Sequence, residues 1–538
     1  MTDKHWVPAF VLKTTGWGGR LMGMVIGAVA VLGHAPFHWW PLTLISLALL
    51  LARLQFAAKE SRHIRAGFSA SFWYAFGYFL AGTYWIGSAF IARGPEFIPI
   101  MPPMILGLGA LLAFFWGLAG AVYVKIRPEG LAVLPAFFSL FFLAEFVRGH
   151  IFGGFPWNLM GYVFEAGGRI SQFASIGGIY GLTFMVFILS ALLYGVVFTR
   201  NRTSFSAVFI VLFGAVYGAG HMRLSDAETG TVEGVKLRIA HVRFNQSDKL
   251  DPEGAFNIVN AFITQSVSPG IEDITHLIWP EGAVNGLALE NQSLMNAMGY
   301  ELSLIDNTPP IWLLNSLRHE QRPNPINGDI IDDYYNSSAA ISFTPRGIPS
   351  ISAFNDKQRL VPFGEFIPGG KWMEARNVPV ISTSLLSISA AKTKLLASFP
   401  GLPKLSPQIC YEIIFSGLTP RPKNEAQAEW ILNQSNDAWY GNSIGPMQHA
   451  NMSKYRAIEE GVPVIRAASN GISAIIDPYG RYKKFVTPSK SQFIDGSLPK
   501  SIKKPPFRGL INYLLSLINI LIALCCATVL LRGSREIP

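Results

Sequence analysis

The stretch Leu405-Ser406-Pro407-Gln408-Ile409-Cys410-Tyr411-Glu412 joins a short strand-like run to a cysteine and a carboxylate. Cys410 is one of three cysteines, and the other two, Cys525 and Cys526, lie in an apolar run near the C-terminus. A cysteine at a strand end is a candidate nucleophile where neighbouring groups activate its thiol, and otherwise a buried core residue. The choice between these two interpretations depends on the residues upstream.

The composition is too apolar for a soluble enzyme. Of the 538 residues, 50% are hydrophobic and only 14% are charged, whereas about a quarter are charged in soluble domains. The net charge of +10 could indicate nucleic-acid binding, but the Lys and Arg residues gather beside apolar runs, as they do at the ends of membrane spans. We therefore expect a membrane protein with no nucleic-acid partner. No zinc-type Cys/His spacing, P-loop or GxGxxG after a strand is present, so we expect no metal and no cofactor.

Eight apolar runs are candidate membrane spans, because a helix needs about 20 apolar residues to cross a bilayer. The second run is short and contains Arg53, whose head group we expect at the interface. Residues 1–221 are thus predicted to be a seven-span helical bundle, 222–507 a second domain, and 508–538 a last span with a tail. The eight runs are 20–37, 39–56, 68–92, 102–124, 131–149, 171–199, 204–221 and 508–531.

The basic residues are distributed unevenly between the connections. They gather before the first span, between the second and third, after the fourth and sixth, and at the C-terminus, while the alternate connections contain few. The positive-inside rule then predicts that both termini are cytoplasmic and that residues 222–507 lie on the outer face. In a bacterium this is the periplasmic side of the inner membrane.

Residues 222–507 differ in character from the rest, because short β-rich runs alternate there with helical patterns. This alternation predicts an α/β layered domain. Strands are expected at 235–244, 275–279, 310–316, 336–343, 349–355, 405–410, 429–434, 462–468 and 472–477, and helices near 252–266, 288–303 and 444–460.

Chemically active side chains follow three of these strand-like runs. Glu281 follows an apolar strand, Lys357 follows another, and Cys410 follows a third. Each of them alone is more often a solvated charge or a core thiol, but together they fit an acyl-transfer site. Cys410 would attack a carbonyl and Glu281 would take the thiol proton. Lys357 would stabilise the thiolate and the oxyanion, alongside a backbone N–H near Tyr411.

The chain resembles the nitrilase superfamily in these stretches and bacterial apolipoprotein N-acyltransferases over nearly its whole length. The resemblance implies a four-layer αββα nitrilase-like domain joined to an α-helical transmembrane bundle. It also implies a triad of Glu281, Lys357 and Cys410. The matching motifs are Trp279-Pro280-Glu281, Lys357 with Pro362-Phe363-Gly364-Glu365, Cys410-Tyr411-Glu412, Ala35-Pro36-Phe37, Glu145 with Arg148-Gly149, Phe155-Pro156-Trp157, and Asn436-Asp437-Ala438-Trp439-Tyr440-Gly441 running to Gly445-Pro446-Met447-Gln448-His449.

By the same resemblance, Glu365, Tyr411 and Glu412 are supporting active-site residues. The implied reaction is ping-pong: a phospholipid acylates Cys410 as a thioester, and the acyl chain passes to the α-amine of an apolipoprotein's diacylglyceryl cysteine. The alternative is a membrane-tethered nitrilase-type amidase with water as acceptor, although a hydrolase of soluble amides needs one anchor rather than eight spans.

Two segments near the triad could act as lids, since both implied substrates are lipids. They are residues 366–372 and 384–400, and each is equally well interpreted as an ordinary surface loop.

The chain departs from the family pattern after the first strand of the second domain. The family usually has Gln-Gly-Asn-Ile-Pro-Gln, whereas His241-Val242-Arg243-Phe244-Asn245-Gln246 stands here, and Leu250 replaces an expected Trp. The family's Lys-x-His reads Lys357-Gln358-Arg359. The triad is unchanged, so the resemblance predicts the same chemistry and leaves open how the acyl chain or head group is held.

Overall fold

The computed structural model describes residues 8–323, 330–362, 364–366, 388–393, 395–422, 426–502, 505 and 507. The chain divides into two compact units, one of residues 1–227, 442–451 and 504–538 and the other of residues 228–441 and 452–503. The first unit therefore takes in a segment, 442–451, that chain order alone assigns to the second domain. The domain boundaries expected at 221 and 507 stay a prediction.

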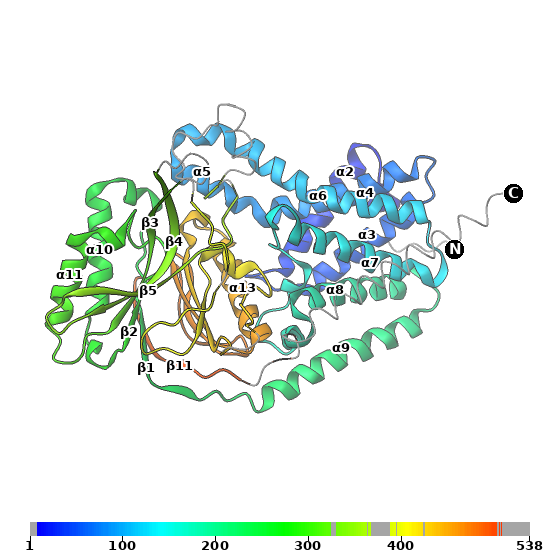
Figure 1. Ribbon diagram of the computed structural model, residues 1–538. Helices are drawn as coiled ribbons and strands as arrows, with labels where there is room; N and C mark the ends of the chain where they lie inside the picture. Colours follow the sequence, from blue (N-terminus) through cyan, green and yellow to red (C-terminus); the bar gives the residue numbers. More distant parts are fainter. Residues whose placement is uncertain are drawn as a thin grey trace. The chain divides into compact units, whose positions relative to one another are not determined.

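Seven helical segments of the described residues are long and apolar enough to cross a membrane, and they correspond to the first seven predicted spans. The eighth predicted span, 508–531, lies outside the described residues. The helices of this unit are α1 (Ala9–Leu12), α2 (Gly16–Ala30), α3 (Trp40–Ala57), α4 (His63–Thr83), α5 (Gly87–Arg93), α6 (Met101–Ile126), α7 (Val133–His150), α8 (Ala174–Phe198) and α9 (Arg202–Ser225) (Figure 1).

Arg53 of α3 is packed against neighbouring helices. Its side chain is fully buried, and its guanidinium donates to the backbone carbonyls of Val11 and Gly19. A buried charge is costly unless its hydrogen-bonding groups find partners. Helices α1 and α2 provide such partners, and the position of the head group relative to the membrane interface stays a prediction.

Glu145 and Arg148 of α7 form a buried ion pair with an N–O distance of 2.6 Å. Arg148 also donates to the carbonyls of Phe155 and Trp157, in the loop that follows α7. The pair therefore fixes this Gly- and Pro-containing loop against the helix that precedes it.

The second unit contains two β-sheets. The first has the strand order β11-β1-β2-β3-β4-β5 and the second the order β10-β9-β8-β7-β6. In each sheet three neighbouring strands are parallel, β1-β2-β3 and β6-β7-β8, and the others are antiparallel. The strands are β1 (Thr231–Ile239), β2 (His276–Ile278), β3 (Ile311–Pro323), β4 (Ile330–Phe343), β5 (Pro349–Asp356), β6 (Leu405–Pro407), β7 (Trp430–Asn436), β8 (Val464–Ser469), β9 (Ser473–Ile476), β10 (Tyr482–Val486) and β11 (Ile494–Pro499).

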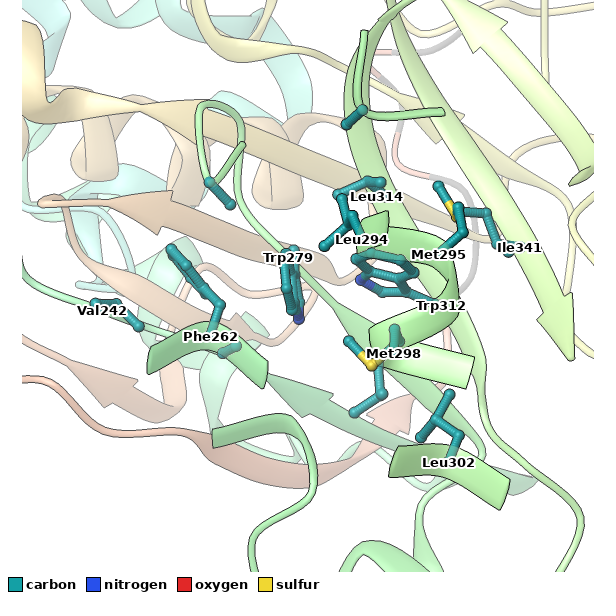
Figure 2. Close-up of a cluster of buried hydrophobic side chains, with 14 of the residues drawn as sticks. Val242, Phe262, Trp279, Leu294, Met295, Met298, Leu302, Trp312, Leu314 and Ile341 are labelled. Atoms are coloured by element: carbon teal, nitrogen blue, oxygen red, sulfur yellow. The ribbon is translucent and has the colours of Figure 1, made fainter. Parts of the chain in front are cut away.

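Alternating side chains of the first sheet contribute to two separate cores. Leu277, Trp312 and Leu314 pack with α10 (Pro252–Ser266) and α11 (Gln292–Ser303), while Ile278 and Leu313 pack in a cluster that includes strands of the second sheet. This alternation follows from the period of two along a strand. The first sheet thus lies between a helical layer and the second sheet, as Figure 2 shows for the helical side.

A further helix, α13 (Gly445–Glu460), covers the second sheet and completes the four layers. Its Ser453 donates to Asn433 of β7 and accepts a hydrogen bond from Arg466 of β8. The nitrilase-like α/β fold is thereby confirmed. Strands β10 and β11 were not predicted, because Lys483, Lys484 and Gly496 interrupt the apolar pattern in them.

Two neighbouring tryptophans in the helix-facing core allow a paired test of packing (Figure 2). The rings of Trp279 and Trp312 lie 4.7 Å apart. Trp279 Nε1 donates to Ser266 Oγ at 2.8 Å, whereas Trp312 Nε1 is buried without a hydrogen-bond partner among the described residues.

We expect Trp279→Phe to lower the melting temperature more than Trp312→Phe. Both changes remove similar apolar area, but only the first removes a hydrogen bond, which contributes about 1 kcal/mol. Differential scanning calorimetry of the full-length protein in detergent measures the difference. Equal melting temperatures for the two variants would contradict this account of the core.

Candidate active site

The structure brings Glu281, Lys357 and Cys410 together in the second unit. Glu281 follows β2 by three residues, Lys357 follows β5 directly, and Cys410 follows β6 by three residues. The charges of Glu281 and Lys357 both act on the pKa of the Cys410 thiol, so the three groups share one electrostatic site. The residues come from both sheets: β2 and β6 are strands of the parallel parts, whose ends commonly carry functional groups, and β5 is an antiparallel strand of the first sheet.

Lys357 is the central cation of the site. Its side chain is 1% exposed, and its Nζ lies 2.8 Å from Glu365 Oε1 and 3.6 Å from Glu281 Oε1. Burial alone would lower the pKa of Lys357, but the two carboxylates outweigh burial and raise it well above the usual value. The lysine therefore stays protonated at any physiological pH.

The carboxylate of Glu281 is held by donors from two other strands. Asn336 Nδ2 of β4 donates to Oε1 at 2.8 Å, and the backbone N–H of Asn436, at the end of β7, donates to Oε2 at 2.9 Å. Ser469 Oγ of β8 donates to the backbone carbonyl of Glu281 at 2.9 Å. Strands of both sheets thus fix the orientation of this carboxylate.

Cys410 lies in a tight turn rather than at the end of a strand. The strand predicted at 405–410 ends at Pro407, and Cys410 begins a 3-10 turn with φ = +48°. A residue other than glycine rarely adopts this left-handed conformation, and such strain often occurs at functional sites. Burial, with the charge of Glu281 adding to it, raises the pKa of the thiol above its usual value, although Lys357 acts in the opposite direction.

The raised pKa has a consequence for activation of the nucleophile. The raised pKa favours the protonated thiol of Cys410 at rest. A thiol in this state needs a base in order to react, and Glu281 is the carboxylate whose charge acts most strongly on it.

Glu412 connects the lysine segment to the cysteine turn. Its Oε1 accepts the backbone N–H groups of Gln358 and Arg359 at 2.8 and 3.1 Å. Its Oε2 accepts the N–H of Ile409, one residue before the nucleophile, at 2.9 Å. One buried carboxylate therefore holds the two segments that carry Lys357 and Cys410 in register.

Glu365 has a similar tethering role on the other side of Lys357. Its Oε2 accepts the N–H of Val361 at 2.8 Å, while its Oε1 is shared by Lys357 and Asn336. Tyr411 is buried beside the nucleophile, and burial raises the pKa of its hydroxyl above the usual value.

Part of one expected lid segment is bonded to these residues. The N–H of Ile388 donates to the carbonyl of Glu365, and the N–H of Ala391 donates to the carbonyl of Lys357. Residues 367–387 lie outside the described residues, so the lid hypothesis for 366–372 and 384–400 stays a prediction.

Two asparagines in this site were not identified as site residues from the sequence. Asn336 donates to both Glu281 and Glu365, and Asn315 of β3 donates to its side-chain oxygen at 2.8 Å. An asparagine within a buried apolar strand was the available signal, because such a group requires partners. In the described part of the chain, no group of three or more His, Cys, Asp or Glu side chains is placed to hold a metal ion.

Comparisons with known proteins agree with this architecture. The N-terminal domain of apolipoprotein N-acyltransferases matches residues 26–192, and the carbon-nitrogen hydrolase domain matches residues 251–499. The apolipoprotein N-acyltransferase of Rhodopseudomonas palustris is 33% identical over 534 residues, covering 97% of this chain and 96% of that protein. Those of Caulobacter vibrioides and Bradyrhizobium diazoefficiens are 33% and 32% identical, covering 86% and 92% of both chains in each pair.

Seven apolar helices joined to a two-sheet α/β unit that contains a partly buried glutamate with a buried lysine and cysteine define a multi-pass membrane protein of the carbon-nitrogen hydrolase class. Within this class, the chain belongs to the apolipoprotein N-acyltransferase family.

We expect Glu412→Gln to release one of the two segments that this carboxylate connects. A glutamine has a single acceptor oxygen and would place an amide donor opposite a backbone N–H. Hydrogen exchange of Gln358 and Arg359, or of Ile409, should accelerate by about 10- to 100-fold, since hydrogen bonds to charged groups contribute about 1.5–3 kcal/mol.

Mass spectrometry of deuterated peptides measures this exchange. Glu429→Gln, an exposed glutamate on the same unit, is the matched control and should leave all three amides unchanged. Unchanged protection at all three positions in Glu412→Gln would show that Glu412 does not hold the segments.

Proposed function

We propose that this protein transfers a fatty acyl chain from a membrane phospholipid, through a thioester on Cys410, to the amine of an apolipoprotein's N-terminal diacylglyceryl cysteine. The observation that carries the proposal is the buried Lys357, paired with Glu365 and Glu281 and electrostatically coupled to Cys410. This arrangement contains a nucleophile, a base and a fixed positive charge, which acyl transfer requires.

In the first half-reaction, the sulfur of Cys410 attacks the ester carbonyl of the phospholipid while Glu281 takes the thiol proton. The negative charge that develops on the carbonyl oxygen is stabilised by Lys357 and by a backbone N–H near Tyr411. The tetrahedral intermediate collapses by breaking the ester C–O bond. The leaving lysophospholipid oxygen takes the proton from Glu281, and the acyl group remains as a thioester.

In the second half-reaction, the α-amine of the acceptor attacks the thioester carbonyl. Glu281 now takes a proton from the amine, the C–S bond breaks, and an amide forms on the acceptor. The released thiolate is reprotonated by Glu281, so each group returns to its starting state. The single base acts twice because, in each step, one proton passes from the attacking atom to Glu281 and then to the leaving atom.

The membrane-spanning unit supports a lipid as the acyl donor. Seven apolar helices far exceed the one anchor that a hydrolase of soluble amides requires. An amidase with water as acceptor is therefore the less favoured function, and the fate of the thioester distinguishes the two.

We expect the wild-type protein to gain the mass of one acyl chain when it is incubated in detergent with phospholipid, and Cys410→Ala to gain none. Intact-mass spectrometry measures the adduct. Addition of a diacylated lipopeptide with a free α-amine should discharge the adduct and yield the N-acylated peptide. An adduct on Cys410→Ala, or release of free fatty acid alone, would refute the transferase mechanism.

We also propose that the second unit is periplasmic and that both termini are cytoplasmic, because the connections α3–α4, α6–α7 and α8–α9 contain the clustered basic residues. An exposed position in each compartment allows a direct test. Ser61 lies in the α3–α4 connection, and Tyr300 of α11 is 64% exposed.

With the three native cysteines replaced, a membrane-impermeant maleimide added to spheroplasts should label Tyr300→Cys and not Ser61→Cys. Permeabilised cells are the control, in which both positions should react. Labelling of Ser61→Cys in intact spheroplasts would reverse the orientation.

A further inference from the structure

A second buried lysine lies beside the turn that carries Glu281. Lys249, on the short 3-10 helix Gln246–Leu250, is 7% exposed, and its Nζ donates to the backbone carbonyl of Gly282. Gly282 has φ = +74°, and a Cβ at this position would lie 2.8 Å from Lys249 Nζ and 2.6 Å from Asn436 Nδ2. The lysine therefore approaches the turn closely, and only glycine leaves space for it.

The charge of Lys249 has no carboxylate within ion-pair distance in the described chain. Its stabilising contacts are the Gly282 carbonyl and the ring of Phe244, whose centroid lies 4.4 Å from Nζ. Burial lowers the pKa of Lys249 to about 8, and the charge of Glu281 acts against this effect. A buried cation with so few partners is normally replaced by an apolar residue unless its charge is used.

The surroundings of Lys249 contain few other titratable groups. It lines a cavity of about 300 Å³ whose walls on α10 and α11 are formed by apolar, Asn and Ser side chains. On its own turn, Asp248 accepts hydrogen bonds from the backbone N–H of Asn245 and from Ser247 Oγ. Glu281 is thus the carboxylate that acts on the lysine.

We propose that protonated Lys249 is a positioning residue for Glu281, because it holds the Glu281–Gly282 turn through the Gly282 carbonyl. This inference rests on the proposed role of Glu281 as the base. The carboxylate of Glu281 accepts hydrogen bonds from Asn336 and Asn436, and its backbone carbonyl accepts one from Ser469. Lys249 donates to the next backbone carbonyl, that of Gly282, and is the one charged donor among these four residues.

The proposal predicts an alkaline limit to acylation. Lys249 is protonated below its pKa of about 8 and loses its charge, with its cation–π contact, above it. The pKa values of Lys357 and Cys410 are both raised well above this range, so neither group accounts for a transition near pH 8. The rate of acyl-enzyme formation should therefore fall as the pH rises through about 8.

The experiment measures this rate by intact-mass spectrometry from about pH 6 to about pH 10. Full-length protein in detergent is used with phosphatidylglycerol, whose head group does not titrate in this range. Lys249→Arg, which stays charged, should move the alkaline limit upward by about one pH unit or more. Lys249→Met should reduce the rate below pH 8 by about 10- to 100-fold and abolish the transition. Lys236→Met, an exposed lysine of β1, is the matched control and should behave as wild type.

Three results would overturn the proposal: a wild-type profile without a transition near pH 8, a transition that persists unchanged in Lys249→Arg, or a folded Lys249→Met protein with the wild-type rate and profile. Melting temperatures identify any variant that does not fold. In that case the pH profile of acyl-enzyme formation by the wild-type protein alone tests the proposal. If the wild-type protein forms no adduct at any pH, the proposed function fails instead.

Discussion

The ammonium of Lys357 between two carboxylates is the interaction on which the rest of the site depends. A buried lysine is expensive to desolvate, and here Glu365 at 2.8 Å and Glu281 at 3.6 Å both offset that cost. Burial disfavours a thiolate at Cys410, the charge of Glu281 adds to this effect, and Lys357 opposes it. Burial and the carboxylates that hold the lysine therefore both favour the protonated thiol. Glu281, which we propose as the base, is one of the two carboxylates around Lys357.

This arrangement requires backbone precision, which other carboxylates provide. Glu412 bonds to N–H groups on both the lysine and the cysteine segments, and Glu365 bonds to Val361 N–H as well as to Lys357. A carboxylate suits this task because it accepts several hydrogen bonds with two oxygens. The supporting residues thus act mainly by fixing loops, while the chemistry is proposed for the triad.

The sequence predicted the architecture well where a residue's type and its place along a strand were sufficient. Seven spans followed from apolar length, and Glu281, Lys357 and Cys410 followed from their positions near strand ends. The hydrogen-bond partners of Arg53 could not be predicted from the sequence, because the two carbonyl groups belong to other helices, α1 and α2. Asn336 was not identified for a related reason. It donates to Glu281 and Glu365, which are distant from it in the sequence and come close to it only when the strands of the sheet pair.

The departure from the family pattern after β1 is a coordinated change rather than a loss. Where the family has proline, Asn245 provides a backbone N–H that donates to Asp248 Oδ2, and proline has no such hydrogen. Where the family has isoleucine, Phe244 provides an aromatic face for the ammonium of Lys249. Both changes stabilise the short helix that carries this lysine towards Gly282. The altered run therefore contacts the backbone next to Glu281 through Lys249, whatever contact it makes with the acyl chain.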